Sequence, residues 1–188
     1  MAKYGAKYIK WAPTATTPDD ALPTYGTAES LSKLVKVTET PNFSEGKQFG
    51  DNELCEYAKE FVDADLAIEV TDQTPAGAAA LYGAAVDSGT SGTGNVTYKS
   101  TDTQPYGGLA FYACKMVNGV KKYVGHFFPL VKASLSEEDF ETKGDSITFV
   151  NSKINFKALA CNSGAWHITS AELTTEAAAK TWVDGRFS

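Results

Sequence analysis

Cysteine and histidine are scarce in this sequence, which has three cysteines and two histidines among its 188 residues. Cys55, Cys114 and Cys161 lie far apart and are odd in number, so they indicate neither a disulfide framework nor a redox or zinc motif. His126 and His167 have no neighbours at the spacing of metal ligands or of a catalytic triad. The sequence therefore predicts no enzyme, no metal site and no cofactor.

Long apolar runs are also absent. No segment approaches the roughly 20 apolar residues that a membrane-spanning helix needs. The opening sequence MAKYGAKYIKWAP has no apolar stretch of the kind that secretory signals contain. We therefore expect residence in a reducing cytoplasm and no contact with a membrane. The 10 Phe, 9 Tyr and 3 Trp are enough to build one sizeable core.

Positive charge is nearly missing from one acidic segment. Residues 39–69 hold nine carboxylates and two lysines, for a net charge of −7, whereas the rest of the chain sums to +1. Such a surface repels the phosphates of a nucleic acid. Within it, the sequence TETPNFSEGKQFGDNELCEYAKEF, residues 38–61, separates strand-like runs at 33–37 and 64–71 and is long for a simple connection.

Apolar and polar residues alternate over much of the chain, which is the period of a half-buried strand. Val35 and Val37 show this pattern, as do Leu66, Ile68 and Val70. The alternation predicts strands on both sides of the acidic segment.

Two hairpins are predicted further along the chain. Asn118-Gly119 suits a two-residue type I′ turn, and the resulting register sets Phe111 opposite His126. A second hairpin is predicted over residues 146–158.

Two helices are predicted beside these strands. Thr74 is suited to the N-cap of one helix, with Pro75 as its first residue, and Thr175 caps another that Gly185 ends. Many short strands with two helices predict a mainly β fold, namely an antiparallel β-sandwich or barrel of two packed sheets with flanking α-helices.

One domain is expected. Residues 1–28 are expected to form an N-terminal arm, in which KYGAKYIKWA is compatible with one strand and the following stretch is rich in Pro, Thr and Asp without any period. Residues 29–188 are expected to form a single β-rich domain, with an extended hairpin around 38–61.

A series of segments, in this order, resembles the major tail proteins, or tail tube proteins, of long-tailed bacteriophages and prophages of Gram-positive bacteria. The resemblance runs from about residue 2 to residue 185, and no single motif in it is diagnostic. The segments are KYGAKYIKWAP, DALPTYG, LVKVTETPNF, GDNELCEY, PYGGLAFYACKM, KASLSEEDFETKGDSITF and TTEAAAKTWVD.

This resemblance implies a structural virion protein that self-assembles into stacked hexameric rings. The rings would form the tail tube, with an electronegative lumen through which double-stranded DNA passes during ejection without specific binding. Implied partners are further copies of the chain, the tape-measure protein and the tail-terminator protein. Assembly would take place in the host cytoplasm, and the protein would then reside in the virion tail.

Within that hypothesis, the acidic hairpin reaches an adjacent subunit and also borders the DNA path. Glu56, Glu60 and Glu69 are the candidates for the lumen, because alternation sets them opposite apolar residues. Alternation leaves open which face is inner, so these glutamates can equally lie on the outer surface. The candidates for the subunit interface are Phe43, Phe49, Asp51, Asn52 and Tyr57.

A second function stays open from the sequence alone. A β-sandwich of this kind also suits a carbohydrate- or receptor-binding module of a phage adhesion apparatus. Such a module would be a monomer or a small closed oligomer with exposed aromatic residues, whereas a tail tube protein would polymerise.

Overall fold

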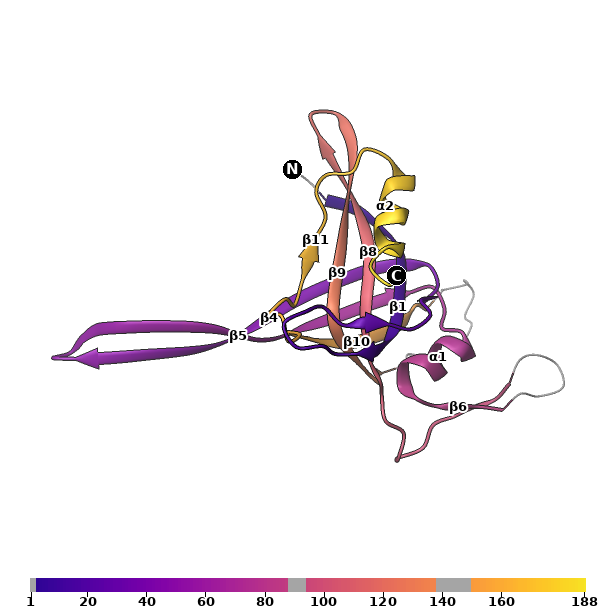
Figure 1. Ribbon diagram of the computed structural model, residues 1–188, viewed down its shortest axis with the longest axis horizontal. Helices are drawn as coiled ribbons and strands as arrows, with labels where there is room; N and C mark the ends of the chain where they lie inside the picture. Colours follow the sequence, from indigo (N-terminus) through magenta and orange to yellow (C-terminus); the bar gives the residue numbers. More distant parts are fainter. Residues whose placement is uncertain (1–2, 88–93, 138–149) are drawn as a thin grey trace, which may run out of the picture.

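The computed structural model describes residues 3–87, 94–137 and 150–188, and β-strands dominate it (Figure 1). Within these residues there are eleven strands and two helices. Their bounds are β1 (Lys3–Thr16), β2 (Thr24–Tyr25), β3 (Glu29–Ser30), β4 (Leu34–Gly50), β5 (Glu53–Val70), α1 (Pro75–Tyr82), β6 (Ala85–Val86), β7 (Val96–Thr97), β8 (Tyr106–Val117), β9 (Val120–Ser134), β10 (Ser152–Leu159), β11 (Ile168–Thr169) and α2 (Glu176–Asp184).

Nine of these strands form one antiparallel sheet, along the order β2-β1-β8-β9-β10-β5-β4. β3 also pairs with β1 and β11 with β9, while β6 and β7 form a separate two-stranded sheet. The large sheet curls, so that the start of β1 comes close to β4 without pairing with it. The predicted mainly β, antiparallel fold with flanking helices is confirmed. Its strands form one large sheet and one small sheet, which is consistent with a β-sandwich.

Two apolar cores cover the two faces of this sheet, and successive residues of β8 alternate between them. The larger core joins residues from most of the strands to one side of α1, among them Ile9, Trp11, Leu66, Leu81 and Phe128. The smaller core packs α2 against β8 and β9, through Tyr112, Phe127 and Val183.

The prediction of an N-terminal arm over residues 1–28 is corrected by the structure. Lys3–Thr16 instead forms β1, which pairs with β8 and places Trp11 in the larger core. The sequence is compatible with a strand here, but two irregularities interrupt its pairing with β8. Gly5 and Tyr8 have positive φ angles of 62° and 59°, and the pairing register shifts between Tyr4 and Lys10. Each shift breaks the period of two on which the pattern depends.

The first predicted hairpin is confirmed. Asn118 and Gly119 have φ angles of 49° and 78°, as a type I′ turn requires, and Phe111 lies opposite His126. The second predicted hairpin, over residues 146–158, is corrected where the structure describes it. β10 pairs with β9 on one side and with β5 on the other. It is therefore an interior strand of the sheet, and residues 146–149 lie outside the described residues.

Both helices begin where their caps predict. The Thr74 hydroxyl accepts a hydrogen bond from the Gly77 backbone N–H at 3.2 Å, at the start of α1. The Thr175 hydroxyl accepts one from the Ala178 N–H at 3.1 Å, at the start of α2. These bonds satisfy N–H groups that the first turn of a helix leaves without a partner.

Because β1 belongs to the core, we expect Trp11→Ala to lower the free energy of unfolding by about 3–5 kcal/mol, the usual cost of emptying a buried aromatic site. Trp11 is only 1% exposed. The measurement is urea unfolding followed by circular dichroism. Lys7→Ala, on the exposed side of the same strand, is the control and should change stability by no more than about 0.5 kcal/mol. A cost as small as this for Trp11→Ala would restore the idea of a separable N-terminal arm.

Candidate functional site

The most prominent feature of the molecule is a two-stranded ribbon that projects from the body (Figure 1). β10 accompanies β5 only from Val70 to Ala64, whereas β4 and β5 stay paired as far as Gly50 and Glu53. We call residues 43–61 the arm. The extended hairpin expected around 38–61 is therefore present, but its first residues, 38–42, lie within the sheet.

The tip of the arm is a tight turn at Asp51-Asn52. Both residues have positive φ angles, 49° and 66°, which a two-residue type I′ turn requires and which Asp and Asn tolerate better than most residues. The two interface candidates Asp51 and Asn52 are thus the leading end of the arm, and both are exposed.

Two bulges in β5 decide which side chains share a face. The register shifts by one residue at Val62, between the pairs Asn42–Asp63 and Phe43–Phe61, and again at Cys55. β4 has no such shift between Lys36 and Gly50. Since residues directly opposite each other in a hairpin point to the same side, the partners of β4 define two continuous faces along both strands.

One side of the arm, the aromatic face, carries its apolar side chains. The predicted interface residues Phe43, Phe49 and Tyr57 all lie on it and are exposed, Phe49 to 65%. Exposed aromatics gathered on one side of a ribbon are typical of a surface that contacts another protein. The full face consists of Phe43, Glu45, Lys47, Phe49, Leu54, Tyr57, Lys59 and Phe61.

Charged side chains on the aromatic face are paired with their neighbours. The Lys59 ammonium lies 3.0 Å from the Glu45 carboxylate and 4.6 Å from the centre of the Phe43 ring. The hydrogen bond from Lys59, and then that from Tyr57, holds the pKa of Glu45 below its ordinary value. Lys47 lies 5.9 Å from the ring centre of Tyr57. This face is therefore almost balanced in charge.

The opposite side of the arm, the acidic face, has small or polar residues and carboxylates. Glu56 lies opposite Gln48, and Glu60 lies opposite Ser44, so both lumen candidates point away from the aromatic face. No cation of the described residues lies within ion-pair distance of Glu53, Glu56 or Glu60. The full face consists of Ser44, Gly46, Gln48, Gly50, Glu53, Glu56, Ala58 and Glu60.

Glu69, the third lumen candidate, lies in the body instead of the arm. It is opposite Lys36, and the Val62 bulge places it on the same side of the ribbon as Glu56 and Glu60, although its number is odd and theirs are even. Glu69 is half-buried and lies 3.9 Å from the Lys36 ammonium. The three candidates thus share a face, but only the two in the arm lack a cationic neighbour in the described part of the chain.

The two carboxylates at the root of the arm share one cation. Lys157 of β10 lies 2.6 Å from Asp65 and 3.2 Å from Asp63. The Asn42 amide donates to both carboxylates, each at 2.7 Å. Among the described carboxylates of the acidic side of the ribbon, those of the arm thus have no cation in ion-pair distance, whereas those of the root do.

Both outer edges of the arm are open. Among the described residues β4 pairs with β5 alone, and β5 has no second partner beyond Ala64. The outer N–H and C=O groups of both strands are therefore available to pair with another chain.

The two histidines lie together near the base of this ribbon. His126 Nδ1 and His167 Nε2 share a hydrogen bond of 3.0 Å, and His167 Nδ1 lies 3.3 Å from the Glu39 carboxylate. Their rings stack with Phe111 and Phe128, so they are part of the packing. Over the described residues no group of three or more His, Cys, Asp or Glu is arranged to hold a metal ion.

No protein-family model matches this chain, and no curated protein matches it at a significant level. In the part of the chain that the structure describes, no helix is both long and apolar enough to span a bilayer.

Sequence reasoning found the extended hairpin and its aromatic residues, but it missed the turn at Asp51-Asn52 and the contacts that surround the root. Trp166 stacks on Phe61, and Lys157 binds the two aspartates, from elements far away in the sequence. Neither residue stands in a motif, so no local signal marks it. The Val62 bulge also has no signature in the pattern of residues.

Titration of Asp65 tests the ionic contacts at the root. Its pKa is held below the ordinary value of 3.8 mainly by the hydrogen bond from Lys157 and secondly by that from Asn42. A lowered pKa in the folded state means that the contribution to stability is complete above pH 3.8 and is lost as the pH falls through the folded-state value.

We expect the carboxyl carbon of Asp65, followed by NMR, to titrate below pH 3.8 in the wild type and closer to 3.8 in Lys157→Met. Lys36→Met removes the neighbour of Glu69 instead and should leave the Asp65 midpoint in place. If Lys157→Met leaves the titration midpoint of Asp65 unchanged, the contact between Lys157 and Asp65 does not persist in solution.

Proposed function

We propose that this protein is the structural subunit of a phage tail tube, and that copies of it assemble into stacked rings around a channel for DNA. The observation that carries the proposal is the arm, a ribbon with two open edges, an exposed aromatic face and an acidic face on the opposite side. The resemblance of the sequence segments to tail tube proteins supplies the kind of assembly.

The aromatic face suits a contact with a second copy of the chain. Phe43, Phe49 and Tyr57 offer apolar area that water covers in the isolated molecule, and aromatic residues dominate the binding energy of protein interfaces. The arm and the surface that receives it are different patches, so the contact is head-to-tail. Such contacts close into rings or propagate without end, and a tube uses both outcomes.

The acidic face suits the wall of a DNA channel. Each lysine–phosphate contact adds affinity through the release of counterions, and a passage must not hold the duplex that it conducts. Glu56 and Glu60, with Glu53, present carboxylates and no cation along the outer part of the ribbon. Glu69 adds less net charge because Lys36 lies beside it.

The remaining features of the proposal follow from the resemblance. They are six subunits in a ring, the tape-measure and tail-terminator proteins as partners, passage of double-stranded DNA without specific binding, and a place in the virion tail. A non-enzymatic role agrees with a surface whose distinctive chemistry is concentrated in one protruding ribbon.

Removing the arm tests the assembly role. Replacement of residues 44–60 by Asn-Gly joins Phe43 and Phe61 through a two-residue turn and leaves the sheet intact. We expect a folded monomer, because the buried core residues all lie outside the deleted segment. Negative-stain microscopy should then show no tubes or stacked rings at concentrations where the full chain forms them.

Circular dichroism and the unfolding midpoint of the shortened chain are the controls for folding. Normal tubes from this variant would contradict the assembly role of the arm. Discrete particles of the full chain that bind glycans would favour the carbohydrate- or receptor-binding module instead.

Charge reversal tests the acidic face. The double variant Glu56→Lys, Glu60→Lys should still form tubes, because neither residue lies on the aromatic face. Its tubes should retain duplex DNA at low salt, and the logarithm of affinity should fall with the logarithm of salt by about 0.9 for each phosphate that the new lysines neutralise. The measurement is nuclease-protected DNA that sediments with the tubes.

A control variant makes the same change of net charge on the exposed body, through Asp19→Lys and Glu29→Lys. Equal protection of DNA by both double variants would mean that Glu56 and Glu60 do not line the channel.

A further inference from the structure

The direction in which the arm leaves the body determines where its tip lies. Over the about eight residue steps from Phe43 to the tip, a rise of about 3.3 Å per residue makes a lever of roughly 26 Å, so a swing of about 10° moves the tip by about 4.5 Å. That displacement is close to the ~4.8 Å spacing between paired strands. A loosely held arm would therefore miss its contact by a whole strand.

The point at which the arm leaves the body is weak by itself. There the pairing of β5 with β10 ends, at Ala64. Two residues away, the bulge at Val62 interrupts the regular pairing of β5 with β4. A ribbon of two strands has little stability of its own in water. Some other contact must therefore set the angle at which it emerges.

On the aromatic side, the root rests against Trp166. The rings of Phe61 and Trp166 stack with centroids 4.5 Å apart and planes at 18°, and Phe43 packs edge-on to Phe61 at 6.1 Å. Trp166 also packs against the larger core, next to Phe128. The stack therefore ties the first pair of the arm to the body.

The segment that carries Trp166 is itself held from several sides. The next residue, His167, stacks on Phe128 at 4.3 Å, shares its hydrogen bond with His126, and meets Glu39 of β4. β11 then pairs with β9 directly after it. The position of Trp166 is thus fixed by contacts within the body and does not depend on the arm.

On the opposite side, the root is held by polar contacts. Asn42 and Asp63 are the last pair before the bulge, and the Asn42 amide bridges Asp63 and Asp65. The Lys157 ammonium holds the same two carboxylates from β10. The stack and this polar cluster meet the ribbon within one residue pair of each other, on its two faces.

We infer that these two sets of contacts form a clamp that fixes the direction of the arm, with Trp166 and Lys157 as positioning residues for assembly. The second part of the inference rests on the proposed function, whereas the direction of the arm can be measured in the isolated chain. Loss of either side of the clamp should widen the range of directions without removing the arm.

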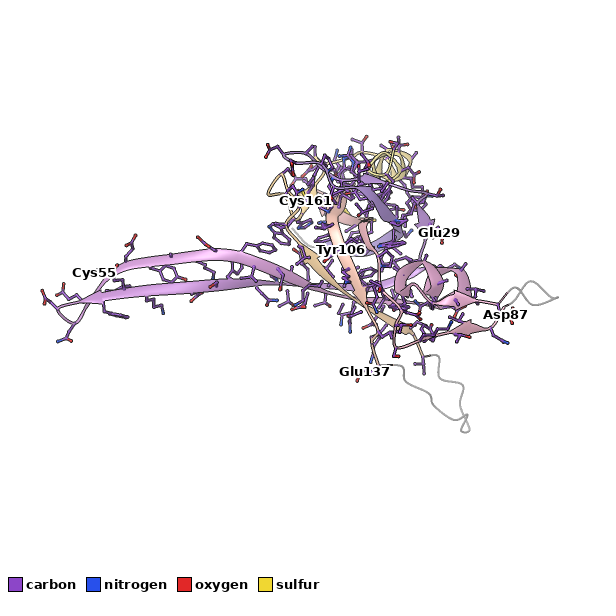
Figure 2. The ribbon with its side chains drawn as sticks, turned by 60° about the horizontal axis from the view of Figure 1, so that its bottom comes forward. Glu29, Cys55, Asp87, Tyr106, Glu137 and Cys161 are labelled. Carbon is purple, nitrogen blue, oxygen red and sulfur yellow. The ribbon has the colours of Figure 1, made fainter. Side chains whose placement is uncertain are left out.

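The arm contains its own site for a probe. Cys55 is exposed near the tip, far from the body (Figure 2), whereas Cys114 and Cys161 are buried. A second spin label at Ala177→Cys, on the exposed side of α2, gives one distance between the body and the tip. The distribution of that distance is measured by pulsed electron paramagnetic resonance, below the concentration at which copies associate.

We expect a narrow distribution in the parent chain and a broad one in Trp166→Ala, with recovery in Trp166→Phe, which keeps a ring to stack on Phe61. Lys157→Met should broaden it as well, and Lys157→Arg should not. If Trp166→Ala does not fold, the Lys157 pair decides the question by itself. An unchanged distribution in Trp166→Ala and Lys157→Met would overturn the clamp.

Assembly of the same variants separates the clamp from the proposed function. If the loosened arm spends about one tenth of its time in the productive direction, the concentration needed for tubes rises about tenfold. A broad distribution with unchanged assembly would overturn the positioning role. If the parent chain forms no tubes at all, the proposed function fails, and the distance measurement still decides whether the clamp exists.

Discussion

Pairing between β5 and β10 ends at Ala64, and the protruding ribbon exists because of this ending. Up to that point β4 and β5 belong to a sheet with a core on one side. Beyond it, as far as the described residues show, they pair only with each other, and each backbone edge is left to solvent or to another chain. Everything distinctive about the molecule, from its open edges to its two-faced ribbon, follows from this loss of a neighbour.

A ribbon without a sheet must be stabilised locally, and the chain does so through cross-strand pairs. Lys59 bridges Glu45 and covers the ring of Phe43, while Lys47 approaches Tyr57. Such pairs are individually weak, because solvent screens charges at the surface. The root therefore matters more than the ribbon, because there the contacts continue into the folded body.

Some elements could be predicted from sequence because their causes are local. The turn at Asn118-Gly119 and the caps Thr74 and Thr175 depend on the backbone preferences of a few neighbouring residues. For β1 the sequence allowed a strand but not its pairing with β8, because that pairing joins elements far apart in the chain and its register shifts near Gly5. For the arm, alternation separated the aromatic from the acidic residues. It could not reveal the bulges, which decide which residues of β5 share a face.

A long acidic hairpin with aromatic residues, inserted in a mainly β chain, can be recognised from the sequence alone, because charge and the period of two are local properties. Long-range contacts, in contrast, set Glu69 on the same side as Glu56, through one bulge, and bring Trp166 against Phe61. Those contacts join elements far apart in the chain. Their existence depends on how the sheet curls, which no local pattern contains.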